Sequence, residues 1–219
     1  MNGILSPVFL QAAGRAGKGG HVGKITLFTQ FANPSISSIS CTGEIKVSSI
    51  YNGEPLVETY SDLDGDALSI QADANTQIVI SGTDITACEI GDNIDYTKIS
   101  VKNTALMGLY CSYCYALTAL DVSKNTALTT LYCEECYALT ALDVSKNTAL
   151  TNLNCENCTK LVSISYPATN EDVSTAIAGA ITAATSTTGT VYSDNTAAYY
   201  NTIKIAAQTK GWTIAPIPA

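Results

Sequence analysis

Cysteine is the residue type with the most reactive chemistry in this chain, and six of its eight cysteines form three Cys-x-x-Cys pairs. The pairs are Cys111 with Cys114, Cys133 with Cys136, and Cys155 with Cys158. Cysteines at this spacing bind zinc, form disulfides or act as thiol redox sites. The elements that position the thiols decide between these possibilities and simple packing.

The three pairs belong to an internal repeat of 22 residues. The blocks are NTALMGLYCSYCYALTALDVSK from Asn103, NTALTTLYCEECYALTALDVSK from Asn125 and NTALTNLNCENCTKLVSISYPA from Asn147. Each block contains a nested period of 11, in which L-x-x-L-x-C-x-x-C is followed by L-x-x-L-x-V-x-x-N. Cys133 thus takes the place of Val144, and Cys136 takes the place of Asn147. The cysteines substitute for an apolar residue and for a turn residue.

This pattern resembles the leucine-rich repeat family, whose unit L-x-x-L-x-L-x-x-[NC]-x-L accepts Asn or Cys at the turn position. The resemblance covers about residues 85–166, where three blocks align without a gap. The repeat is shorter than the commonest forms of the family and carries its strand motif in both halves. We therefore expect extended segments on both sides of a solenoid. The resemblance implies a bacterial protein that binds another protein, at the cell surface or in secreted form.

Alternation of side chains along the extended segments predicts which residues form the core. In L-x-C, Leu131 and Cys133 point inward and Tyr132 points to solvent. Free cysteine behaves as a small, readily buried hydrophobe. We expect asparagine amides to bond backbone groups at the turns, where cysteine supplies fewer bonds. The predicted structural core comprises Leu109, Cys111, Cys114, Leu131, Cys133, Cys136, Leu153, Cys155, Cys158 and the turn residues Asn125 and Asn147.

Three alternatives to packing compete for the thiols. A zinc site needs four ligands, and three equivalent pairs on a ladder divide awkwardly into sets of four. Disulfides between neighbouring coils are allowed by distance, but stacked parallel Cβ vectors suit the bridge geometry poorly. A thioredoxin-like redox site needs a βαβ context and an activated thiolate, and neither is visible. We therefore interpret the cysteines as core and predict no metal site, cofactor or catalytic residue, with disulfide and zinc as open alternatives.

The pattern predicts a β-dominated α/β fold in four parts. Residues 1–23 form a Gly-rich arm, and residues 24–84 form either a small β sandwich or a cap whose last strands join the solenoid. The leucine-rich repeat solenoid occupies residues 85–166. Residues 167–219 form βαβ-type capping coils. Their first helix presents Val173, Ile177, Ile181 and Ala184 on one face, and their second presents Tyr199, Ile203 and Ala206 before a stop at Gly211.

Composition argues against several classes of function. A net charge of −8 disfavours nucleic acid as a partner. We find neither a convincing secretory signal nor a segment apolar enough to insert into a membrane. The one histidine, His21, lies in the Gly-rich arm, where a general base would be hard to position, so we expect no enzyme activity. Asp62, Asp64, Asp66 and Asp73 match a calcium loop poorly and favour an acidic hairpin turn.

Differences between the blocks predict where a partner binds. T-A-L-D-V-S-K is identical at 118–124 and 140–146, whereas outward positions beside the Cys-x-x-Cys turns vary. Uniform positions are typical of scaffold, and exposed tyrosines offer contact area to a partner protein. The predicted ligand-binding residues are Tyr110, Tyr113, Tyr132, Glu134, Glu135, Asn154 and Glu156. In the alternative function, the chain is a structural part of a larger assembly, with the solenoid as spacer and the N-terminal β region docking.

Overall fold

The computed structural model describes residues 22–29, 32, 34–41, 43–83, 85–90, 96–102, 105–166, 171–193 and 200–217. The expected Gly-rich arm lies outside these ranges except for its last two residues, which begin the first strand. The described residues form sixteen strands in three sheets together with two helices. The β-dominated α/β class expected from the sequence is confirmed.

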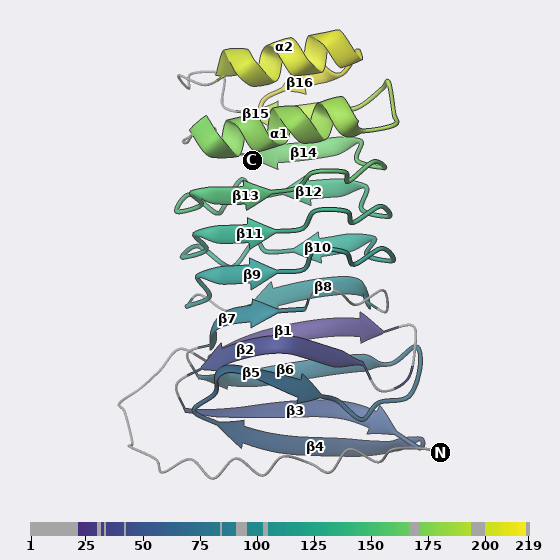
Figure 1. The fold of residues 1–219 in the computed structure, drawn as a ribbon, viewed down its shortest axis with the longest axis vertical. Helices are drawn as coiled ribbons and strands as arrows, with labels where there is room; N and C mark the ends of the chain where they lie inside the picture. Colours follow the sequence, from purple (N-terminus) through teal and green to yellow (C-terminus); the bar gives the residue numbers. More distant parts are fainter. Residues whose placement is uncertain are drawn as a thin grey trace.

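The elements follow one another along an elongated stack, with the longer N-terminal strands at one end and the helices at the other (Figure 1). The longer strands are β1 (Val22–Thr29), β2 (Ser35–Cys41), β3 (Glu44–Tyr51), β4 (Glu54–Ser61), β5 (Asp64–Ser69), β6 (Gln77–Thr83), β7 (Ile85–Glu89) and β8 (Tyr96–Lys102). The shorter ones are β9 (Gly108–Tyr110), β10 (Ala119–Asp121), β11 (Thr130–Tyr132), β12 (Ala141–Asp143), β13 (Asn152–Asn154) and β14 (Ser163–Tyr166). The chain ends in α1 (Glu171–Ala183), β15 (Thr190–Ser193), α2 (Tyr200–Lys210) and β16 (Thr213–Ala215).

On one side of the stack, β7, β9, β11 and β13 form a parallel ladder. Paired strands place equivalent residues of consecutive repeats opposite each other, so Leu131 lies in register with Leu109 of the preceding repeat and Leu153 of the following one. We call each 22-residue turn of the chain a coil. Threonine hydroxyls add bonds between coils, as when Thr129 Oγ1 donates to the Met107 carbonyl at 3.0 Å. Identical residues therefore stack in columns along the molecule.

The opposite side carries a second parallel ladder that is interrupted once. β8 pairs with β10, and β12 pairs with β14, β15 and β16, but no strand pairing joins β10 to β12 within the fully described residues 105–166. Asp121 is paired with Ser100 and Asp143 with Ser165, so an unbroken ladder would place Asp121 directly opposite Asp143. Like charges placed directly opposite each other destabilise a strand pair, and the pairing stops at this point.

Asp121 is held in the ionised form that makes this repulsion effective. Its partial burial raises the pKa of the carboxyl, but hydrogen bonds from Ser123 and Ser100 and the charge of Lys102 outweigh burial, so the pKa is lowered. The Ser123 hydroxyl donates to Asp121 Oδ1 at 2.7 Å, and the Ser100 hydroxyl donates to Oδ2 at 3.2 Å. Asp121 thus caps its own turn and bonds to the preceding strand.

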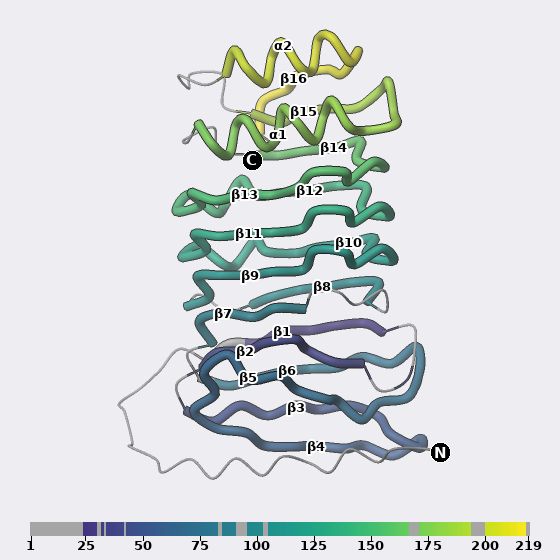
Figure 2. Tube along the Cα trace, viewed as in Figure 1, coloured from purple at the N-terminus to yellow at the C-terminus, as the bar shows by residue number. Residues whose placement is uncertain are grey.

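The N-terminal strands continue both sides of the stack. β2 pairs antiparallel with β7, and β1 pairs antiparallel with β8, so the antiparallel strands share their sheets with the coils. Inward side chains such as Ile25, Ile45 and Ile80 are fully buried between the two sheets. Figure 2 traces the chain from this region directly into the first coil. Residues 24–84 therefore combine the sandwich and cap arrangements that the sequence left open.

The C-terminal helices alternate with strands that extend the second ladder. Val173, Ile177, Ile181 and Ala184 are all buried, as expected for the inner face of α1. In α2 the fully buried residues are Ile203 and Ala207, and Ala206, expected on the inner side, is partly buried and packs against the core. Tyr199 lies outside the described residues. Neither described helix is long and apolar enough to cross a membrane.

The segment after α2 closes this end of the stack. Gly211, with φ of 84°, ends the helix in the left-handed conformation that glycine adopts readily. The indole of Trp212 is buried and donates to the Ser186 carbonyl at 3.0 Å. A Cβ on Gly189 would lie 2.5 Å from that indole, so only glycine fits beneath the ring.

The inward column of the first ladder predicts the effect of a buried charge. Leu131→Asp should lower the free energy of unfolding by more than about 4 kcal/mol, because the site offers an ionised carboxylate no partner. Tyr132→Asp, which introduces the same residue at the neighbouring outward position, should change the free energy of unfolding by less than about 1 kcal/mol. Urea denaturation followed by circular dichroism measures both values. Equal stabilities of the two variants would refute the assigned orientation of β11.

Candidate recognition surface

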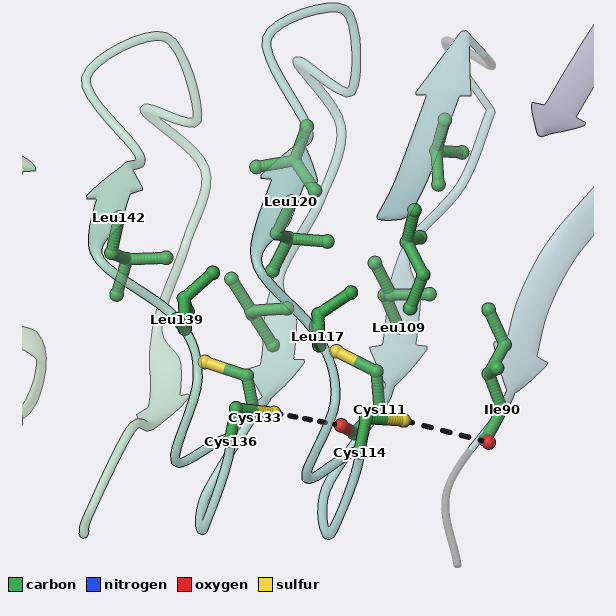
Figure 3. Packing of buried hydrophobic residues seen from close by; sticks show 14 of the residues in the cluster. Ile90, Leu109, Cys111, Cys114, Leu117, Leu120, Cys133, Cys136, Leu139 and Leu142 are labelled. Atoms are coloured by element: carbon green, nitrogen blue, oxygen red, sulfur yellow. Dashed lines mark hydrogen bonds between the residues drawn. The ribbon is translucent and has the colours of Figure 1, made fainter. Parts of the chain in front are cut away.

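All eight cysteines are free and buried. The ladder register places Ile90, Cys111, Cys133 and Cys155 in one column, and Cys88 aligns with Leu109 in the leucine column. Figure 3 shows Cys111, Cys114, Cys133 and Cys136 packed among Leu109, Leu117, Leu139 and their neighbours. The other predicted core residues, including Asn125 and Asn147, are buried as well. The thiols fill space between the two ladders.

The second cysteine of each pair also acts as a hydrogen-bond donor. The Cys136 thiol donates to the Cys111 carbonyl at 3.2 Å, and the Cys158 thiol donates to the Cys133 carbonyl at 3.0 Å. Each bond reaches the coil before, as does the bond from Asn147 Nδ2 to the Val122 carbonyl at 3.0 Å. The cysteine therefore repeats the role of asparagine at the equivalent turn. As expected from the sequence, cysteine supplies fewer bonds than asparagine, since each of these thiols makes one bond to a carbonyl and the Asn147 amide makes two.

A thiol has one advantage over an amide at this position. Asn147 Nδ2 donates to two carbonyls, of Val122 and Asn125, but Oδ1 of Asn147 is buried without a hydrogen-bond partner. A buried unpaired oxygen is destabilising, whereas a sulfur has little need of a donor. Cysteine supplies the bond between coils without introducing such an oxygen.

The buried thiols are unsuited to nucleophilic chemistry. Burial raises the pKa of Cys88 and Cys155 well above the ordinary 9.0. A hydrogen bond with Cys158, followed by burial, raises the pKa of Cys133. The hydrogen bonds that Cys158 forms with Cys133 and Cys136 lower the pKa of its thiol, although burial opposes this shift. Even Cys158 has no exposed surface, so a substrate would not reach it.

Within the described ranges, no group of three or more His, Cys, Asp or Glu side chains is arranged to hold a metal ion. The acidic residues that echo a calcium loop bond to backbone amides instead. Asp73 accepts from the N–H groups of Asn52 and Gly53 at 2.9 and 2.8 Å, which ties down the turn between β3 and β4. Asp62 accepts from the Gly43 N–H at 2.8 Å. These carboxylates stabilise hairpin turns.

The most distinctive surface is the edge formed by the Cys-x-x-Cys turns. We define the turn edge as residues 110–115, 132–137 and 154–159 of three successive coils. It carries five tyrosines, and the rings of Tyr115 and Tyr137 are stacked with centroids 5.2 Å apart. Tyr113 meets Tyr115 edge-on at 6.5 Å, and Tyr110 meets Tyr132 edge-on at 5.4 Å. Aromatic side chains of the turn edge thus form two clusters, one of Tyr110 and Tyr132 and one of Tyr113, Tyr115 and Tyr137.

Two glutamates of the turn edge are fixed by neighbouring side chains. The Asn154 amide donates to the Glu134 carboxylate of the preceding coil. The Tyr137 hydroxyl donates to Glu135 Oε2 at 2.5 Å, and this bond raises the pKa of Tyr137 to about 12. Both carboxylates therefore have defined orientations at the surface.

The backbone of the turn edge adopts a conformation that its residues disfavour. Tyr113, Glu135 and Asn157 occupy the same turn position in the three coils, with φ of 61°, 55° and 57°. Asparagine tolerates this left-handed region, but for tyrosine and glutamate it is unfavourable by about 1 kcal/mol or more. Ladder bonds hold the turns in this shape, since the Tyr113 N–H donates to the Glu134 carbonyl at 2.9 Å and the Glu135 N–H to the Glu156 carbonyl at 2.8 Å. Strain at exposed residues points to a role beyond folding.

The structure brings the predicted ligand-binding residues together on the turn edge. Tyr113 and Tyr132 are exposed, as is Glu156, whereas Glu134, Glu135, Asn154 and Tyr110 are half-buried. Tyr110 is less exposed than expected because its ring folds over Gly108, where a Cβ would lie 3.0 Å away.

Sequence reasoning missed two residues of this surface. Tyr115 and Tyr137 are 41% and 39% exposed, as much as Tyr132 at 38%. They lie outside the stretch T-A-L-D-V-S-K that uniformity assigned to the scaffold, but their own sequence does not differ between the first two blocks either. Their outward placement was the available signal, because each directly follows an inward cysteine at the turn.

No protein-family model, curated protein or solved structure matches this chain. Its function is therefore inferred from the chemistry of the turn edge.

The left-handed turns predict a stabilising substitution. Glu135→Gly should raise the free energy of unfolding by about 0.5–1 kcal/mol, because glycine adopts positive φ without strain. Glu134→Gly, at the neighbouring position where φ is not positive, should lower it. Chemical denaturation of both variants and the parent chain measures the two changes. A loss of stability in Glu135→Gly equal to that in Glu134→Gly would show that the turn is unstrained.

Proposed function

We propose that this chain is a non-catalytic recognition module of the leucine-rich repeat type, which binds a partner protein through the turn edge. The parallel registers of the short strands and the buried leucine columns support a solenoid of this kind. The proposal rests above all on one observation, the cluster of five tyrosines on adjacent coils at the edge where the repeats differ. Tyrosines are enriched at protein interfaces because the ring is large and the hydroxyl forms hydrogen bonds.

The distribution of strain supports the same surface. The turns at the opposite edge, Ser123-Lys124 and Ser145-Lys146, have no positive φ, whereas Tyr113 and Glu135 do. A position free of functional demands would be expected to carry glycine or asparagine, as Asn157 does. Keeping a tyrosine and a glutamate there lowers stability, and a partner that contacts these side chains supplies a reason for their presence.

The alternative role, a structural spacer that docks through the N-terminal β region, is less well supported. That region ends in two edge strands, β4, which pairs only with β3, and β5, which pairs only with β2 and carries Asp64 and Asp66. Pro55 removes a backbone donor from β4, and Glu54 adds an exposed charge. Both features block pairing of an edge strand with another chain. Docking along β4 is therefore disfavoured relative to binding at the turn edge.

The proposed surface can be tested by affinity capture from the organism that encodes the chain. We expect Tyr115→Ala/Tyr137→Ala and Tyr110→Ala/Tyr132→Ala to lose at least about 90% of the captured partner, as for truncation of interface hot spots. The matched control is Tyr51→Ala/Tyr192→Ala, which removes two half-exposed tyrosines from other strands. Thermal melting confirms that each variant is folded. Equal recovery of partners by turn-edge and control variants would reject the turn edge.

A further inference from the structure

We propose that the turn edge binds an extended protein segment rich in arginine or lysine, whose cations contact the glutamates between the tyrosine rings. This inference rests on the proposed recognition function and names the chemistry of the partner.

The turn edge has uncompensated negative charge. Glu134 and Glu135 lie on one turn and Glu156 lies on the next, and no ion pair in the described part of the chain engages any of them. The lysines that recur in the first two blocks, Lys124 and Lys146, lie at the opposite turns. In the third block the exposed Lys160 directly follows the turn edge, but no ion pair joins it to a glutamate within the described residues. The chain as a whole carries a charge of −8, which adds to the local field. A cationic partner is attracted to this surface, and an anionic one is repelled.

The carboxylates are oriented before a partner arrives. Asn154 holds Glu134, and Tyr137 holds Glu135. Each of these contacts uses one acceptor position of a carboxylate that has about four. The remaining positions are available to the forked donors of an arginine or to a lysine ammonium. Because the side chains are already ordered, binding loses less conformational entropy.

The tyrosines provide a second kind of contact for the same cations. A guanidinium or ammonium over an aromatic face within about 6 Å of its centroid is attracted by the ring. The stacked pair of Tyr115 and Tyr137 lies next to Glu135, which contacts Tyr137 directly. Coils are about 4.8 Å apart, so three turns span about 10 Å, the length of about three extended residues. A short segment running along the stack would contact all three coils.

This combination favours a basic protein segment over the other common ligands of exposed aromatic surfaces. Nucleic acid bases also stack on tyrosines, but their phosphates would face three glutamates. Neutral sugars also stack on aromatic rings, but they carry no positive charge to balance the three unpaired carboxylates. A basic segment can contact both the glutamate carboxylates and the tyrosine rings of this surface.

The direct test uses a fluorescein-labelled nonapeptide of alternating arginine and glycine, titrated with the full chain and followed by fluorescence anisotropy. We expect saturable binding that weakens with salt. The same peptide with citrulline in place of arginine keeps the shape of the side chain without its charge, and it should not bind. Equal binding of the two peptides would overturn the proposal.

Matched variants separate a defined site from general attraction to an acidic protein. Glu134→Gln/Glu135→Gln should weaken binding about tenfold, and Tyr115→Leu/Tyr137→Leu should weaken it about fivefold. Glu54→Gln/Glu58→Gln removes the same charge from β4 and should change binding less than about twofold. Equal weakening by the two glutamate pairs would overturn the cation site. If the turn-edge tyrosine variants still lost their partner in the capture experiment, the recognition function would stand and only the basic partner would be rejected.

Discussion

The hydrogen bond from a turn residue to the carbonyl 25 residues earlier, in the coil before, is the interaction on which the stack depends. Asn147, Cys136 and Cys158 each make it. The bond fixes both the spacing and the register of consecutive coils at the point where the strands have ended. Once register is fixed, leucines meet leucines in columns between the two ladders, and hydrophobic burial stabilises the whole stack.

That constraint divides each coil into an invariant interior and a surface free to vary. Positions of the leucines, the inward cysteines and the turn donors are set by the neighbouring coils. Outward positions at the turn edge face no such demand, yet they carry tyrosines and glutamates, two of them in strained backbone. The other edge, with its Ser-Lys turns, shows neither aromatic clustering nor positive φ in its described residues. The residues that stabilise the stack and the surface proposed to bind a partner thus lie on different faces of the same repeat.

The repeat made much of this arrangement predictable. The strict 22-residue repeat predicted from the sequence alone that Leu131, Cys133 and Asn147 point inward, because a one-residue slip would turn each of them outward. Spacing alone did not reveal the break between β10 and β12. It also did not reveal the donor role of the Cys136 thiol. Tyr115 and Tyr137 were missed because their sequence does not differ between the blocks, although stacking of neighbouring coils is what brings identical rings together.

The stacking of the thiols can be seen most directly in a crystal by the anomalous scattering of sulfur. We predict separate peaks in two columns, for Cys111, Cys133 and Cys155 and for Cys114, Cys136 and Cys158, with a spacing of about 4.8 Å along each column. No metal peak should lie among them, and no two sulfurs should approach the bonded distance of about 2.05 Å. Sulfurs gathered around an ion, joined in pairs or scattered without columns would contradict the stack of coils held by buried, free thiols.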